Sequence, residues 1–323
     1  MRVKLNVQTR APPRDTITTD MPATFTIVGL GELIWDLLPT GQQLGGAPAN
    51  FAYGARLLGN AAVVASRVGA DAWGQEARAR LTEMGLDTSC LQQDDAHPTG
   101  TVGVRLDARG EPTFTVNQDS AWDYLEWTES WRALAARADA VCFGTLGQRS
   151  AQARATISSF LEHTRPGALR IFDVNLRHSF FTPDMLDASL RQATVVKLNS
   201  DELARVAAMA GLTARSERDI ARHLLRSFAL ELVAITRGAH GSLLVTADET
   251  SEHPGLRVRV ADTIGAGDAF TAALAHGHLH GARLDDISAA ANRLGAWVVT
   301  QTGATPPPDA QLLAAVRDML HCT

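Results

Sequence analysis

The sequence predicts an α/β fold built around a mostly parallel β-sheet. Short runs of β-branched and other apolar residues alternate with longer stretches of helical periodicity, which is the pattern of βαβ units. The chain has 323 residues, of which 45% are hydrophobic, so it is long enough to bury a substantial core. No apolar run approaches the roughly 18–20 residues that a membrane span needs.

The alternating segments can be placed in order along the chain. We expect strands at residues 25–30, 61–68, 140–143, 170–174, 195–198, 232–236 and 242–246. We expect helices at residues 48–58, 73–84, 150–163, 184–191, 200–210, 217–227, 266–279, 284–300 and 308–320. Gly59 and Gly85 directly follow two of these helices, where glycine commonly ends a helix.

Two stretches interrupt this alternation. Residues 34–44 have the pattern of strands, and residues 101–117 that of a hairpin whose turn lies at residues 107–110. We expect these stretches, within about 34–44 and 99–118, to form a small sheet apart from the main one, as a lid over a cleft. An apolar face on such a lid could pair with a second copy, so we predict a homodimer through it. Residues 1–22 are expected to be a loose N-terminal extension of one domain, 23–323.

Composition excludes several classes of protein. With 30 basic and 35 acidic residues the net charge is −5, which gives no sign of nucleic-acid affinity. The N-terminus lacks the apolar core of a secretory signal, and the three cysteines are far apart, which argues against disulfides or a zinc site. We therefore expect a cytoplasmic protein without membrane or nucleic-acid partners. Only Lys4 and Lys197 are lysines, and Leu198 follows the second, so the chain has no Walker A phosphate-binding loop.

The segment Asp262–Phe270, DTIGAGDAF, is a candidate phosphate site. It leads into an amphipathic helix, so Gly265, Ala266 and Gly267 lie at the helix N-terminus, where free N–H groups and the helix dipole favour an anion. Asp268 falls in the first turn, beside that anion. An anion site with an adjacent carboxylate suits phosphoryl transfer to a hydroxyl. The alternative is a plain glycine turn with Asp268 as a capping residue.

Five motifs in order resemble those of the PfkB, or ribokinase-like, carbohydrate kinases. DTIGAGDAF resembles the C-terminal signature of that family, and the resemblance spans residues 27–306. The other four are GGAPAN at 45–50, VGADAWG at 68–74, NSDE at 199–202 and TRGAHG at 236–241. The resemblance implies a ribokinase-like three-layer α/β/α domain with a small β-sheet lid. The GExxxD, GGAPAN and DxNxR segments are most similar to the fructokinase branch.

The resemblance also implies roles for individual residues. Asp268 is the expected catalytic base, and the backbone of Gly265, Ala266 and Gly267 the expected anion hole. The expected sugar-binding residues are Asp36, Gly45, Gly46, Asn50, Arg105, Asn175 and Arg177. The expected nucleotide-binding residues are Lys197, Asn199, Thr236, Gly238, Gly241 and Asn292. Glu202, together with Asn199, is expected to hold Mg²⁺ through water, and Asp262, Ile264 and Gly303 are candidates for binding K⁺.

For two of these groups the residues alone favour other interpretations as well. NSDE at 199–202 also reads as a helix start, with Asn199 or Ser200 as the cap. A structural ion pair is nearly as good an explanation of Arg177 as a contact to the acceptor or the phosphates.

The function implied is an ATP-dependent kinase acting on a primary hydroxyl of a sugar, with fructose favoured. Where many fructokinase-like relatives carry an arginine near the lid, this chain has Val116-Asn117-Gln118, which favours a neutral sugar. Arg105 could still turn toward the site. The first alternative is a nucleoside kinase on the same fold. A non-catalytic sugar sensor is disfavoured because Asp268 is intact.

Two further patterns carry weaker predictions. Gly29-Leu30-Gly31 could begin a fingerprint for an NAD-dependent dehydrogenase, but Ile34 stands where the third glycine belongs. His276, His278 and His280 alternate on a helix, where only His276 and His280 share a face. Two imidazoles without a third ligand rarely form a metal site.

Overall fold

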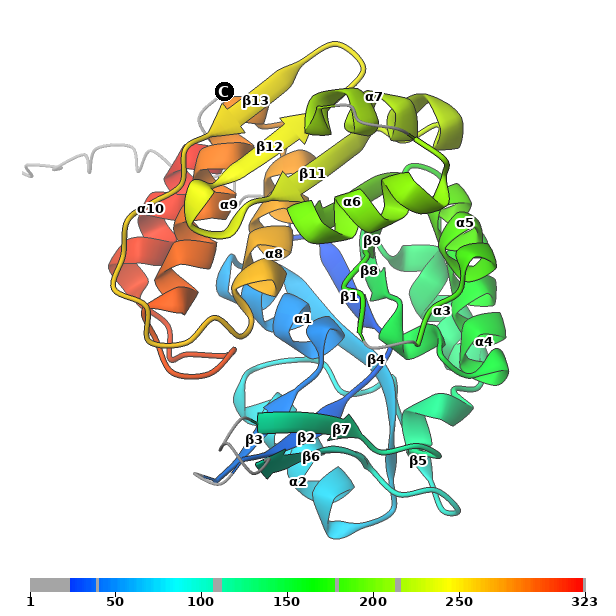
Figure 1. Cartoon of the computed structure of the whole chain (residues 1–323). Helices are drawn as coiled ribbons and strands as arrows, with labels where there is room; N and C mark the ends of the chain where they lie inside the picture. Colours follow the sequence, from blue (N-terminus) through cyan, green and yellow to red (C-terminus); the bar gives the residue numbers. More distant parts are fainter. Residues whose placement is uncertain (1–23, 39–40, 107–111, 178–179, 213–215, 322–323) are drawn as a thin grey trace, which may run out of the picture.

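The protein is a three-layer α/β/α domain with a separate small sheet (Figure 1). This computed structural model describes residues 24–38, 41–106, 112–177, 180–212 and 216–321. The central sheet has nine strands in the order β13-β12-β11-β10-β9-β8-β1-β4-β5. Seven of them, from β11 to β5, are parallel, whereas β12 and β13 are antiparallel at one edge.

Seven of the nine strands of the central sheet follow the predicted apolar runs, the exceptions being β5 and β13. The nine strands are β1 (Thr26–Leu30), β4 (Ala61–Gly69), β5 (Leu91–Asp94), β8 (Ala140–Gly144), β9 (Leu169–Asp173), β10 (Val195–Asn199), β11 (Leu232–Thr236), β12 (Ser242–Val245) and β13 (Thr250–His253). The helices are α1 (Ala47–Leu57), α2 (Ala72–Glu83), α3 (Glu129–Arg137), α4 (Ala151–Glu162), α5 (Pro183–Gln192), α6 (Ser200–Met209), α7 (Glu217–Phe228), α8 (Ala266–Leu279), α9 (Leu284–Val299) and α10 (Ala310–His321). Short 3-10 turns are η1 (Ala121–Tyr124), η2 (Leu146–Gln148) and η3 (Gly238–His240).

Side chains on successive positions of each strand enter two different cores. Ile27 of β1 belongs to the core that residues of α1, α2, α8, α9 and α10 share, while its neighbour Val28 belongs to the core that residues of α3 to α7 share. The alternation arises because successive strand side chains point to opposite faces. Both faces of a parallel sheet are therefore covered by helices, as Figure 1 shows.

Two strands and one α-helix were not expected from the sequence. β5 (LQQD) and β13 (TSEH) are short, polar strands at the two edges of the sheet, so they carry no apolar alternation. Helix α3 does have the sequence features of a helix. Thr128 caps its N-terminus, and Trp131 and Leu134, three residues apart, are buried on one face. Trp127 and Trp131 both pack against Phe160 of α4.

The small sheet contains four strands in the order β3-β2-β6-β7. They are β2 (Ile34–Leu38), β3 (Gly41–Gly45), β6 (Gly100–Leu106) and β7 (Pro112–Val116). On one face Ile34 and Val102 pack with Trp122 and Leu146. On the other face the indole N–H of Trp35 donates to the Trp73 carbonyl at 3.0 Å, so Trp35 is buried within the chain. A homodimer through this sheet stays a prediction.

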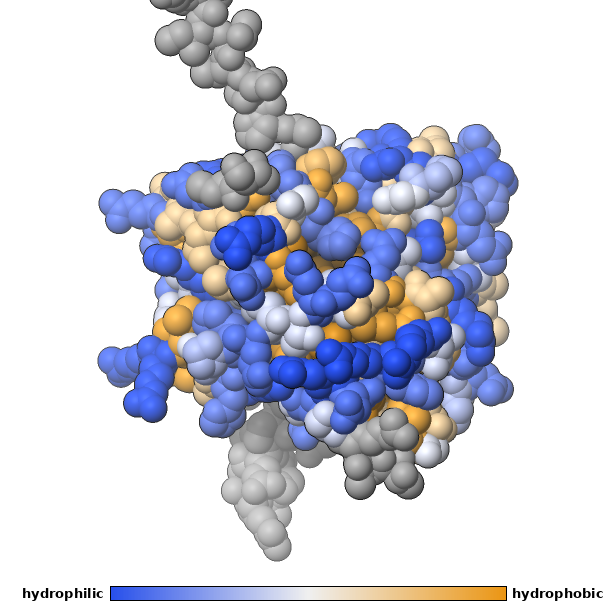
Figure 2. All heavy atoms as spheres, turned by 90° about the horizontal axis from the view of Figure 1, so that it is seen from above, coloured by the Kyte–Doolittle hydropathy of each residue, from blue (hydrophilic) through white to orange (hydrophobic). Residues whose placement is uncertain are grey.

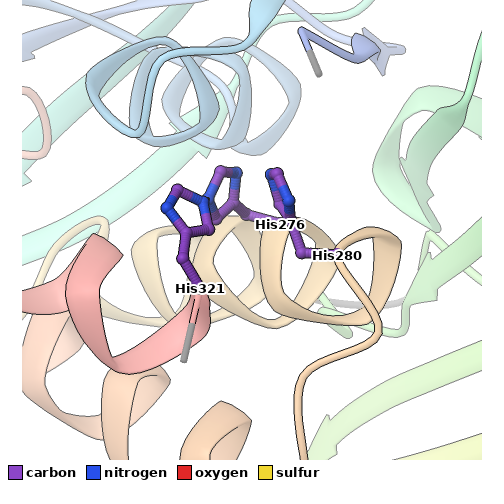
Figure 3. A group of neighbouring side chains, drawn as sticks. All are labelled: His276, His280 and His321. Carbon is purple, nitrogen blue, oxygen red and sulfur yellow. The ribbon is translucent and has the colours of Figure 1, made fainter. Parts of the chain in front are cut away.

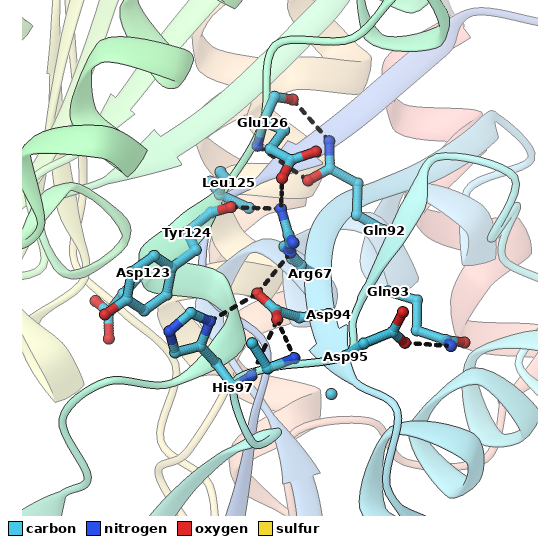
Figure 4. A network of polar contacts seen from close by, with 12 residues as sticks. Arg67, Gln92, Gln93, Asp94, Asp95, His97, Asp123, Tyr124, Leu125 and Glu126 are labelled. Atoms are coloured by element: carbon cyan, nitrogen blue, oxygen red, sulfur yellow. Dashed lines mark hydrogen bonds and ion pairs between the residues drawn. The ribbon is translucent and has the colours of Figure 1, made fainter.

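A polar network anchors the chain where it leaves the main sheet for the lid (Figure 4). Arg67, near the end of β4, pairs with Asp94 at 2.9 Å and with Glu126 at 2.6 Å. Asp94 in turn accepts from the N–H groups of Ala96 and His97. The network joins β4, β5 and the segment after η1, so it holds the base of the lid in place.

None of the described helices is both long and apolar enough to cross a bilayer. Seen from the side of β13 and α7, the surface is largely hydrophilic, with apolar residues showing in smaller areas between the polar ones (Figure 2).

Candidate active site

The N-terminus of α8 has the geometry of an anion site. Gly265 is its N-cap, with φ of +79°, and no side chain caps this end. A Cβ on Gly265 would lie 2.7 Å from the Cα of Ala304, so glycine is required by both conformation and space. The first N–H groups of a helix have no intrahelical acceptor, so those beside Gly267 remain available to an anion.

Asp268 lies in the first turn of α8, as predicted from the sequence. Its Oδ2 accepts a hydrogen bond of 2.8 Å from the side-chain amide of Asn50 on α1. Burial raises the pKa of Asp268 to about 6, and the carboxylate of Asp173 adds to the rise. The carboxyl group is therefore a stronger base than an ordinary aspartate, while still being ionised at neutral pH.

A buried ion pair lies beneath this turn. Lys197 on β10 faces Asp173 at the end of β9, with Nζ at 3.0 Å from both carboxylate oxygens. Thr271 of α8 also donates to Asp173, at 3.2 Å. Burial lowers the pKa of Lys197, but the carboxylate of Asp173 and other nearby acids raise it by more. A Cβ on Gly267 would lie 2.9 Å from Nζ, so the ammonium is next to the anion site.

Glu32 is a site residue that sequence reasoning did not assign. It lies two residues after the end of β1 and is 3% exposed. Burial raises its pKa to about 7, and the charge of Asp268 adds to the rise. Its Oε2 has no hydrogen-bond partner, and neither has Oδ1 of Asn50. A carboxyl group shortly after a buried parallel strand was the available signal, because ligands bind at that edge of a sheet.

The lid contributes Asp36, from β2. Burial raises the pKa of Asp36, and Arg177 opposes the rise. A Cβ on Gly45 of β3 would lie 2.8 Å from Oδ2 of Asp36, and Gly46 has a φ of +110°. This GG pair therefore lets the strand turn into α1 close to the carboxylate.

Arg177 and Asn175 lie in the segment after β9. The charge of Arg177 lowers the pKa of Glu32, of Asp36 and of Asp268. Its side chain is exposed, and no carboxylate among the described residues pairs with it, so the structural ion pair that was the alternative does not form there. Asn175 has a φ of +37°, a strained conformation of the kind that clusters at functional sites.

NSDE at 199–202 forms a helix cap. Oδ1 of Asn199 accepts from the N–H of Glu202 at 2.9 Å, and Oε2 of Glu202 accepts from the N–H of Asn199 at 2.8 Å. Oε1 of Glu202 accepts from the N–H of Leu176 at 2.9 Å. Burial raises the pKa of Glu202. Each carboxylate oxygen keeps one free lone pair, so Glu202 could bind a water of a hydrated ion but has little room for direct coordination.

Four of the predicted nucleotide-binding residues lie on β11, in the turn after it and on α9. Thr236 ends β11, and Gly238 begins the η3 turn that Gly241 closes. The side chain of Asn292 on α9 donates to Ser242 at 2.7 Å, directly after that turn. Lys197 lies apart from these residues, with Asp173.

The segment between β13 and α8 contains most of the exposed large hydrophobic side chains among the described residues. They are Leu256, Val258, Val260 and Ile264, exposed by 40%, 40%, 61% and 43%. The same segment, which is long and irregular in Figure 1, leads into the anion site.

Asp262, Ile264 and Gly303, the candidates for binding K⁺, lie together, and the contacts between them are hydrogen bonds from backbone N–H groups to the carboxylate. The N–H of Ile264 donates to Oδ1 of Asp262 at 3.0 Å, and that of Gly303 donates to Oδ2 at 3.1 Å. The carboxylate thus ties the loop before α8 to the loop after α9.

The side chain of Arg105 lies outside the described residues. The dinucleotide fingerprint at 29–31 does not form, because β1 leads through Glu32 into strand β2 and not into a helix.

Comparison with known proteins shows the family to which the chain belongs. The pfkB family carbohydrate kinase profile matches residues 32–311. The fructokinase of Escherichia coli is 34% identical over 85% of this chain and 93% of its own length. The aminoimidazole riboside kinase of Salmonella typhimurium is 30% identical over 90% of this chain and 94% of its own. A sugar kinase of Pyrococcus horikoshii, solved in complex with ATP, is 27% identical with a TM-score of 0.76 over 92% of this chain and all of its own. The chain belongs to the PfkB family of carbohydrate kinases, phosphotransferases with an alcohol group as acceptor.

Proposed function

We propose that this chain transfers the γ-phosphoryl group of ATP to a primary hydroxyl of a sugar, with fructose as the favoured acceptor. The observation that carries the proposal is the pair of buried acceptor atoms near Asp268, Glu32 Oε2 and Asn50 Oδ1, that have no protein partner. A buried polar atom without a partner is costly. The hydroxyl groups of a polyol would satisfy both atoms while one hydroxyl reaches Asp268.

In this proposal Asp268 accepts the proton of the attacking hydroxyl. The hydroxyl oxygen attacks the γ-phosphorus of ATP, ADP leaves, and the proton passes to the carboxylate. The N–H groups at the start of α8 stabilise the charge on the transferred phosphoryl group. Arg177, whose charge lowers the pKa of Glu32, Asp36 and Asp268, would add to that stabilisation when the lid closes over a bound sugar.

ATP would bind along Thr236, Gly238 and Asn292, with its phosphates directed toward Gly265–Gly267. Support comes from the Pyrococcus relative, which was solved with ATP. The exposed apolar side chains before α8 offer a surface for the flat adenine ring. Asn199 and Glu202 would hold Mg²⁺ through water and so neutralise phosphate charge, and the loop pair joined by Asp262 is the proposed K⁺ site.

The experiment that tests this proposal is a panel of acceptors with ATP and Mg²⁺, followed by ADP release. We expect kcat/KM to be highest with fructose and at least about tenfold lower with ribose and with nucleosides, a difference of about 1.4 kcal/mol. The similarity to an aminoimidazole riboside kinase favours a riboside as the second candidate. A riboside used better than fructose would replace the proposed acceptor. No ADP release above background with any acceptor would favour a non-catalytic sugar sensor.

Replacing Asp36 by alanine is expected to affect the sugar far more than ATP. Losing a charged hydrogen-bond partner costs roughly 1.5–3 kcal/mol, so the KM for sugar should rise about 10- to 150-fold while the KM for ATP stays within about twofold. Gln42→Ala is the control, because Gln42 is exposed on the adjacent strand β3. Equal increases of both KM values would contradict the role given to Asp36.

The pH dependence of kcat/KM should report the pKa of Asp268. Because protonated Asp268 cannot accept a proton, activity should fall below about pH 6, the raised pKa, and not near the value of 3.8 that is ordinary for aspartate. Asn50→Ala removes the hydrogen bond that opposes the rise, so its acid limb should move to higher pH. Asn292→Ala, which alters an asparagine bonded to Ser242, should leave the limb in place. A limb near pH 4 in the unaltered chain would rule out Asp268 as the base.

A further inference from the structure

Three histidines meet at the end of α8 that is remote from Asp268 (Figure 3). His276 projects from the last turn of α8 and His280 from its C-cap position, and His321 reaches the same space from the last turn of α10. The sequence pattern supplied only the first two, on one helix. The third histidine, His321, is on a different helix and lies 41 residues after His280 in the chain.

The spacing of the ring nitrogens suits a single metal ion. Nε2 of His276 lies 3.2 Å from Nε2 of His321, and one ligand nitrogen from each of the three residues lies within 4.8 Å of the others. Two nitrogens bound tetrahedrally to one ion at about 2.0–2.1 Å are about 3.4 Å apart. The pair is therefore near its ligating distance, and small rotations of the His280 ring would complete the set.

The surroundings keep these imidazoles available as ligands. The side-chain amide of Asn60 lies against Nδ1 of His276, with its nitrogen at 3.0 Å and its oxygen at 3.3 Å. When that oxygen accepts Nδ1–H, the lone pair of Nε2 is free for a metal, the arrangement typical of metal-bound histidine. Burial lowers the pKa of His276 to about 3, so its ring is neutral at pH 7. His276 is buried, whereas His280 and His321 are partly exposed, which leaves access for an ion and its remaining water.

We propose that His276, His280 and His321 form a binding site for a borderline divalent transition metal, Zn²⁺ first among them, that ties α10 to α8. Three imidazole nitrogens with a water as the fourth ligand suit Zn²⁺, and Co²⁺ can occupy the same geometry. The hard ions Mg²⁺ and K⁺ prefer oxygen ligands. The ion would cross-link α10 to α8, the helix that carries Asp268. Asp268 and His276 are about 12 Å apart along the axis of α8. We therefore expect the ion to change the stability of the fold.

The test uses the full untagged chain, freed of metal with a chelator and dialysed against Zn²⁺ or titrated with Co²⁺. We expect one equivalent of metal to bind per chain, and bound Co²⁺ to show the visible absorption of a tetrahedral site. We also expect Zn²⁺ to raise the Tm by about 3 °C or more. His321→Ala and His280→Ala should each weaken binding at least about tenfold and remove the Tm shift. These residues are partly exposed, so both variants should fold even if a substitution at buried His276 does not.

His278→Ala is the matched control. His278 lies on the same helix between the two ligands, but it faces Glu231, with Nε2 at 3.5 Å from that carboxylate. We expect its variant to bind Zn²⁺ within about twofold of the unaltered chain. Binding no stronger than in a variant lacking all three histidines, or an equal loss in His278→Ala, would overturn the proposal. The readout is metal binding, so either outcome leaves the kinase assignment unaffected.

Discussion

Asp268→Asn is expected to lower kcat about 10²- to 10⁴-fold, the usual contribution of a general base, while ATP binding changes by less than about threefold. The asparagine can turn its oxygen toward Asn50 and keep the 2.8 Å hydrogen bond that Asp268 now accepts. It cannot accept a proton from the sugar hydroxyl. Because Asp268 shares its surroundings with the carboxylate of Asp173, removing its charge should not destabilise the fold.

The measurement is kcat with saturating sugar and ATP, together with ATP affinity from calorimetry. Asp201→Asn is the matched control, because Asp201 is an exposed acid in the first turn of α6 and should keep full activity. A kcat for Asp268→Asn within tenfold of the unaltered enzyme would show that another group accepts the proton.

Lys197→Met should lower the free energy of unfolding by roughly 3–5 kcal/mol, the usual cost of removing one partner from a buried ion pair. The variant leaves Asp173, which is 3% exposed, with only the Thr271 hydroxyl as a partner from α8. Loss of the ammonium also removes a charge that lowers the pKa of Asp268. The acid limb of kcat/KM should therefore move to higher pH in this variant.

A double variant distinguishes the ion pair from simple packing. Asp173→Asn combined with Lys197→Met replaces both charges by neutral groups of similar volume, and we expect it to recover most of the lost stability. Urea unfolding of the single and double variants at pH 7.5 provides the comparison. A double variant no more stable than Lys197→Met would mean that packing of the lysine stem, and not its charge, stabilises this region.

Much of the fold could be predicted because its signals are local. The parallel strands other than β5 are mostly apolar runs. Eight of the nine predicted helices match an observed helix of nearly the same bounds. The ninth was predicted to begin at residue 308 and begins at Ala310. β5 and β13 were missed because edge strands with polar side chains have no apolar pattern. The order of strands in the sheet could not be derived, because pairing depends on contacts between distant residues.

The candidate site likewise combines features set by residues close in sequence with features set by contacts between distant residues. The position of Asp268 relative to Gly265 follows from three residues of separation and the geometry of a helix start. Glu32 was missed because a lone acidic residue after a strand acquires significance only when it is buried. The partner of Lys197 could not be named, because Asp173 becomes its neighbour only through the register of β9 and β10.

The sequence by itself determined the fold class, the family resemblance and the local geometry of the α8 N-terminus, because each depends on residues adjacent in the chain. The tertiary structure alone decided the Lys197–Asp173 pair, the raised pKa of Asp268 and the meeting of His321 with His276 and His280. These depend on which elements pack together and on how much water packing removes. Desolvation and charge act through space, so they are set only once the sheet and its helices have assembled.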